Sequence, residues 1–154
     1  MIERKVGPVQ FEFEKLEVYQ DAKAFRVRIY KLTKLLPRSE FKLRMQMREA
    51  ARSMTNCLAE GHGRYTYKDR THFCRESRGS LCELIDDISI FDQEGYAKHD
   101  HLEDLRWDGA QVLKKLNGYI KYLTDEGRRL VASKTSRQHR ENGRMIQEPT
   151  ITNY

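Results

Sequence analysis

The stretch LEDLRWDGAQVLKKLNGYIKYL, residues 102–123, contains the clearest hydrophobic repeat in the chain. Its apolar and small residues recur at alternating steps of three and four, at Leu102, Leu105, Gly109, Val112, Leu116, Tyr119 and Leu123. That spacing places them on one stripe of an α-helix, as in helices that pack together in bundles. The stretch therefore predicts a long amphipathic helix that starts after Asp100.

Three further stretches with helical spacing precede this one. The first covers residues 16–36 and ends before a proline, which disfavours a helical residue before it. The second covers residues 40–60, and the third starts after Thr66, whose hydroxyl can cap a helix start. The breaks between the four stretches are short, so the helices are expected to be neighbours in space.

Single residues at the breaks give more detailed expectations. We expect Ser39 to cap the start of the second helix and Gly61 to end that helix in a left-handed turn. Gly79 falls in the interior of the third helix, where glycine costs about 1 kcal/mol relative to alanine. Its presence predicts the close approach of a neighbouring helix at that position.

Four comparable helices with short loops predict an all-α fold, an antiparallel up-down-up-down four-helix bundle. We assign residues 16–126 to the bundle and residues 1–15 to an N-terminal extension. The hydrophobic period stops after Gly127, so residues 127–154 are predicted to be a disordered, polar and basic C-terminal tail.

The composition narrows the cellular context. No apolar run approaches the roughly 18 residues of a membrane span, and the first residues lack the apolar segment of a secretory signal. Three cysteines do not suggest a disulfide framework. We expect a cytoplasmic protein that does not engage a membrane.

The net charge of +6 is unevenly distributed along the chain. Residues 38–78 carry ten basic and five acidic side chains, whereas residues 79–108 carry two basic and nine acidic ones. In an up-down-up-down bundle this makes one end basic and the other acidic. The loop between the second and third helices and the end of the fourth helix share the basic end.

A basic end with aromatic residues can bind phosphates and stack on bases. We therefore predict nucleic-acid binding by the basic and aromatic residues of this end, namely Arg64, Lys68, Arg70, Arg128, Arg129, Tyr65 and Tyr67. The alternative is solvated charge that partly compensates the helix dipoles, and the sequence leaves it open.

No pattern in the chain predicts an enzyme. There is no GxSxG turn for a nucleophile and no glycine-rich loop for a nucleotide, so neither a catalytic residue nor a cofactor is expected. Cys57, His62, His72 and Cys74 form no CxxC or HxxxH pair, so no metal site is expected. The carboxylates Glu83, Asp86 and Asp87 lack the Glu-x-x-His motifs of a di-iron bundle.

For two groups of residues the sequence leaves two roles open. Gln46, Ser53 and Glu60 lie seven residues apart on one helix face. They could form a polar pocket or a hydrogen-bonded layer that fixes helix register. Trp107 and Tyr122 lie beside the main stripe, either partly buried in the bundle or at a subunit interface.

Four segments resemble a known bacterial family: FEKLEVY at 13–19, LRMQMREAARS at 43–53, AEGHGR at 59–64 and GSLCEL at 79–84. This is the four-helix-bundle family of 23S rRNA intervening-sequence proteins, and the resemblance covers roughly residues 11–125. It implies a homo-oligomer, a pentamer in particular, with RNA or another nucleic acid as partner. The accessory proteins of diversity-generating retroelements are similar, which implies a second possibility, a scaffold or accessory subunit for a reverse transcriptase or other polymerase.

Overall fold

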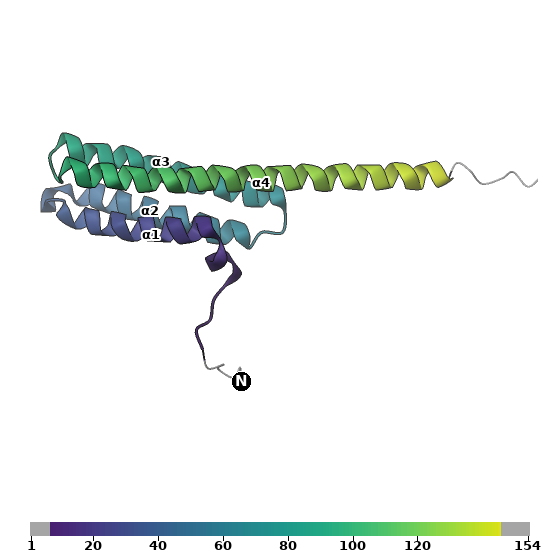
Figure 1. Ribbon diagram of the computed structural model, residues 1–154, viewed down its shortest axis with the longest axis horizontal. Helices are drawn as coiled ribbons and strands as arrows, with labels where there is room; N and C mark the ends of the chain where they lie inside the picture. Colours follow the sequence, from purple (N-terminus) through teal and green to yellow (C-terminus); the bar gives the residue numbers. More distant parts are fainter. Residues whose placement is uncertain (1–6, 146–154) are drawn as a thin grey trace, which may run out of the picture.

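The computed structural model describes residues 7–145, and their side chains as far as Arg140. Four helices, α1 (Glu17–Leu32), α2 (Phe41–His62), α3 (Tyr67–Gln93) and α4 (His99–Met145), form an antiparallel up-down-up-down bundle (Figure 1). Short 3-10 turns lie at Glu12–Lys15, Thr33–Leu35 and Arg38–Glu40. Each helix packs against two others, so the four surround one core. The predicted all-α bundle is confirmed.

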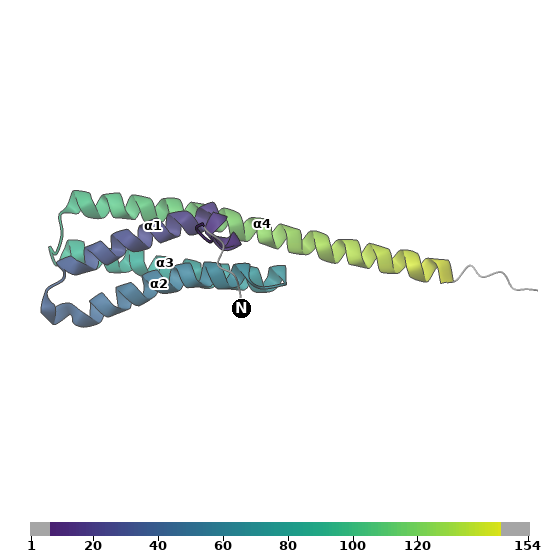
Figure 2. The same cartoon turned by 90° about the horizontal axis from the view of Figure 1, so that it is seen from below.

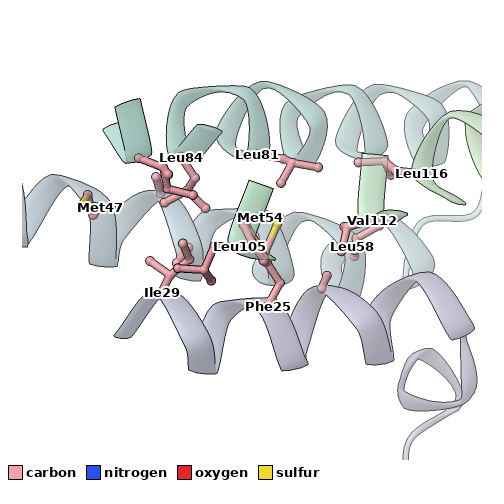
Figure 3. Close-up of a cluster of buried hydrophobic side chains, with 14 of the residues drawn as sticks. Phe25, Ile29, Met47, Met54, Leu58, Leu81, Leu84, Leu105, Val112 and Leu116 are labelled. Atoms are coloured by element: carbon pink, nitrogen blue, oxygen red, sulfur yellow. The ribbon is translucent and has the colours of Figure 1, made fainter. Parts of the chain in front are cut away.

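The core consists of the hydrophobic stripes that the sequence predicts. Phe25 and Ile29 of α1, Met54 of α2, Leu84 of α3 and Leu105 of α4 meet in its centre, each fully buried (Figure 3). Within the described residues, no helix is both long enough and apolar enough to cross a bilayer.

The glycines have other roles than those predicted. Gly61 is buried within α2, and a Cβ atom on it would lie 2.8 Å from the Cβ of Phe73 on α3. The helix instead ends at His62, and Gly63 follows with a right-handed conformation. The close approach expected at Gly79 is wrong, since nothing lies within 4 Å of the position of its Cβ. The sequence therefore places the tight contact on the wrong glycine.

Of the two N-terminal caps predicted from the sequence, the one at α3 is present and the one at α2 is not. Ser39 does not cap α2: it lies inside a 3-10 turn, and the residue before α2 is Glu40, with no side-chain cap. Thr66 does cap α3, because the backbone N–H of Asp69 donates to its Oγ1 at 3.0 Å. A turn of 3-10 helix already orders the backbone before α2, so no capping hydroxyl is needed there.

Helix α4 continues far past the expected end of the bundle, beyond the loop between α2 and α3 (Figure 2). The disorder predicted from residue 127 onward is thus wrong for residues 127–145, which are helical. The sequence offers no proline in this part, and Leu130 and Val131 continue the apolar stripe for another turn. The expected disorder of the tail then concerns residues 146–154, which lie outside the described residues, as do residues 1–6 of the N-terminal extension.

Candidate nucleic-acid interface

The α2–α3 loop and the first turns of α3 lie at the end of the bundle from which α4 runs on (Figure 1). All seven residues predicted to bind nucleic acid belong to this end. The opposite end is acidic, with Asp92 near the end of α3, Glu94 in the link that follows and Asp100 in the first turn of α4. Asp92 lies 3.1 Å from Nδ1 of His99, and this hydrogen bond raises the pKa of the histidine.

A groove of about 800 Å³ runs between the start of α3 and the part of α4 that leaves the bundle. Its floor is formed by apolar side chains, Leu123, Leu130, Val131 and Ala132. Its rim carries four cations, Lys68, Arg75, Arg128 and Lys134. Tyr65 and Tyr67 also line it, and its lining contains no carboxylate among the described residues.

The groove is open because the two helices meet closely at one point and α4 then extends alone. A Cβ atom on Gly127 would lie 3.2 Å from the Cβ of Tyr67, so a glycine lets α4 approach α3 at the base of the groove. Tyr67 is partly buried there, whereas Tyr65 in the loop is fully exposed. Four of the seven predicted residues therefore share the groove: Tyr65, Tyr67, Lys68 and Arg128.

Arg64 and Arg70 lie outside the groove lining and are held by contacts within the chain. Arg64 pairs with Glu60, and its guanidinium lies 4.7 Å from the ring centre of Phe73. Arg70 donates from Nε to the carbonyl oxygen of Arg64 at 2.7 Å. These contacts order the loop on which Tyr65 sits, so they position the groove mouth.

The cations of α4 next to the bundle are partly neutralised. Arg129 donates to Glu126 at 2.6 Å, and Arg128 lies 3.6 Å from Asp125. Lys121 also donates to Asp125, and this bond is the main reason that the pKa of the carboxyl is lowered. Within residues 7–140, by contrast, Lys68, Arg75 and Lys134 have no carboxylate in ion-pair range. Three cations of this end without a carboxylate partner among the described residues therefore line the groove.

Sequence reasoning missed Arg75, Lys134 and the apolar floor. A signal for each was present. Arg75 lies seven residues after Lys68, on the same face of α3, and Leu130 continues the seven-residue spacing of Leu116 and Leu123. The polar composition after residue 127 predicted an irregular tail, although Leu130 continues the helical spacing there.

The helix face of Gln46, Ser53 and Glu60, for which the sequence left a pocket or a layer open, forms hydrogen bonds to α3 only through Ser53 among these three described residues. Ser80 of α3 donates to Ser53 of α2 at 3.0 Å, while Gln46 and Glu60 of the same predicted face are exposed. The buried hydroxyl of Ser77 donates to the carbonyl oxygen of Met54 at 2.7 Å. These bonds link α2 to α3 and favour the interpretation as a layer that fixes helix register.

Two of the three cysteines, Cys57 and Cys74, are thiols in a poorly solvated setting, whereas Cys82 is exposed. Burial raises the pKa of Cys74 to about 11, and burial is also the main reason that the pKa of Cys57 is raised. Both are therefore protonated at neutral pH, which disfavours nucleophilic or metal-binding roles. In the part of the chain that the structure describes, no three His, Cys, Asp or Glu side chains are placed to hold a metal ion.

Comparisons with known proteins agree with this fold. A protein of the S23 ribosomal protein family from Bacteroides thetaiotaomicron, described as having unknown function, has a similar structure, with a TM-score of 0.63 at 20% identity. The similarity covers 68% of this chain and 95% of that one. No curated protein matches the chain in sequence.

The sequence pattern is more specific than the structural likeness. The model of the family described as 23S rRNA-intervening sequence protein matches residues 14–118. The match spans all of α1, α2 and α3 and the part of α4 up to Gly118, so the α4 side of the groove, from Leu123 onward, lies outside the matched residues. The chain belongs to the family of 23S rRNA-intervening sequence proteins.

Proposed function

We propose that this protein is a non-enzymatic, cytoplasmic nucleic-acid-binding protein, with RNA as the partner. The observation that carries the proposal is the groove, where four cations from α3 and α4 face a shared space without a lining carboxylate. Lys68, Arg75 and Lys134 are free to neutralise phosphates, which supplies most of the affinity in such interfaces. Membership of a family described by its relation to 23S rRNA favours RNA.

The test is a titration of a labelled oligoribonucleotide, followed by fluorescence anisotropy. In one variant, Lys68→Gln, Arg75→Gln and Lys134→Gln are combined, which removes three charges from the groove rim. A matched control combines Lys31→Gln, Lys34→Gln and Lys42→Gln, three exposed lysines on or next to the link between α1 and α2, at the opposite end. The groove variant should bind at least tenfold more weakly than the control, and equal binding by the two variants would refute the proposal.

We also propose that the protein is a homo-oligomer, with five copies as the family resemblance implies. Support comes from the outer face of α4, where Trp107 is 68% exposed beside a hollow lined by Ile85 and Leu113. An exposed tryptophan next to apolar side chains is typical of interface centres. Light scattering should give a multiple of the chain mass, and Trp107→Glu should reduce it to the monomer.

The same face supports the second candidate function, a scaffold for a reverse transcriptase or other polymerase. If Trp107→Glu leaves the mass unchanged, the tryptophan is not at the self-association surface and remains available to a protein partner. A polymerase that binds the unmodified protein but not the Trp107→Glu variant would then favour the scaffold over the RNA-binding function.

A further inference from the structure

We infer that the groove selects unpaired, single-stranded RNA over duplex RNA. This inference rests on the proposed function and specifies the partner of the same site. It comes from the combination of an apolar floor with a cationic rim. A surface that binds phosphates by charge alone would need the cations but not the apolar floor.

Figure 2 shows where α4 leaves the bundle, and just beyond that point part of the floor is exposed. Leu130 is 46% exposed and Val131 is 65% exposed, although both follow the buried stripe that ends at Leu123. Leu123 itself is only 1% exposed, so the exposed part of the floor runs from Leu130 to Ala132, about 3 Å at the usual rise of about 1.5 Å per residue. That length accommodates about one base, since stacked nucleotides are about 3.4 Å apart.

The cations are distributed along the length of the groove. Lys68 and Arg75 are two helical turns apart on α3, and Arg128 and Lys134 are six residues apart on α4. Lys68 and Arg75 therefore share one face of α3, whereas Arg128 and Lys134 lie about 120° apart around α4. A strand that follows the groove can therefore meet the cations of both helices with its phosphates and place a base on the exposed part of the floor.

Tyr65 supplies an aromatic face at the mouth of the groove. Its side chain is fully exposed, and the loop that carries it is ordered by the contacts of Arg64 and Arg70. Stacking of a base on an aromatic ring contributes to binding whatever the base is, so it gives affinity without sequence specificity.

A duplex can use the rim but not the floor. Its bases are already stacked on one another, and double-stranded RNA is contacted through phosphates and 2′-hydroxyls. An apolar peptide, conversely, would match the floor but gain nothing from four cations. The combination of the two features therefore fits a single strand better than either alternative.

The experiment compares a labelled oligoribonucleotide as a single strand with the same strand annealed to its complement, at one salt concentration. The unmodified protein should bind the single strand at least tenfold more tightly. The variant with Tyr65→Ala and Val131→Ser should lose most of this preference and keep its duplex affinity, because both side chains are exposed and neither is charged. Tyr65→Trp should retain the preference.

The outcomes separate the inference from the proposed function. Equal affinity for the two RNA forms, or a preference that survives Tyr65→Ala with Val131→Ser, overturns the inference and leaves nucleic-acid binding in place. Absence of binding to both forms overturns both. Self-association that is lost in the same double variant, without a change in RNA preference, assigns the floor to a second copy and also overturns the inference.

Discussion

Replacement of Gly61 by alanine tests the contact on which the packing of α2 against α3 depends. The added Cβ would lie 2.8 Å from the Cβ of Phe73 and 3.4 Å from the carbonyl oxygen of Arg70. Neither atom can rotate away, because both belong to or are bonded to the α3 backbone. The two helices must therefore separate by several tenths of an ångström to regain an ordinary contact distance.

The magnitude follows from two opposing effects. Overpacking of this kind costs about 1–3 kcal/mol, whereas alanine in place of glycine within a helix stabilises by about 1 kcal/mol. We expect Gly61→Ala to lower the free energy of unfolding by about 1–2 kcal/mol, since the rigid contact places the overpacking cost in the upper half of its range. Urea unfolding followed by circular dichroism measures this change.

Gly79→Ala is the matched control, because it makes the same substitution within α3 where nothing lies within 4 Å of the new Cβ. Helix propensity alone then acts, and the variant should be more stable by about 0.5–1 kcal/mol. The two substitutions should thus have opposite signs. If Gly61→Ala stabilises the protein as much as Gly79→Ala does, the described approach of α2 and α3 is wrong.

Three further predictions concern single groups in the bundle. Burial, with smaller contributions from Glu83 and Asp86, raises the pKa of Asp87 to about 6, and its Oδ2 has no hydrogen-bond partner among the described residues. Since the folded pKa lies above the unfolded value of 3.8, the native state loses stability as the pH rises from about 4 to about 6. Asp87→Asn should therefore raise the free energy of unfolding by about 1 kcal/mol near neutral pH and by almost nothing below about pH 4. The value near neutral pH is reduced because the side chain is partly exposed. Equal effects at both pH values would contradict the raised pKa of Asp87. In the folded protein a thiol reagent should modify the exposed Cys82 quickly and the buried Cys74 only on unfolding, as mass spectrometry of the labelled peptides would show; rapid labelling of Cys74 would be inconsistent with its burial. Ser77→Ala should lower the free energy of unfolding by about 1 kcal/mol, because it removes the bond to the carbonyl of Met54, and an unchanged urea midpoint would argue against that bond.

The extent of sequence-based prediction differs between the core and the helix ends. The stripe from Leu102 to Leu123 predicts its own burial, because helical periodicity requires only the spacing of apolar residues. Gly61 is different, since a glycine that ends a helix and a glycine that admits a neighbouring helix have the same sequence signature. Only the position of Phe73 on another helix distinguishes them.

The candidate interface was predicted in part for a related reason. Tyr65, Lys68 and Arg128 follow from charge and aromatic content near one end of a bundle. The groove itself depends on the continuation of α4 past Gly127, and composition alone suggested an irregular tail there. Lys134 acquires a defined place only once the continued helix brings it to the groove.

The salt dependence of RNA affinity tests the central claim most directly, because the claim is that groove cations neutralise phosphates. For a single strand, the slope of log affinity against log salt concentration changes by about 0.7 for each phosphate contact. The variant with Lys68→Gln, Arg75→Gln and Lys134→Gln should therefore show a slope that is shallower by about 2 than that of the unmodified protein. Identical slopes for the two proteins would contradict the account, since the groove cations would then contact no phosphate.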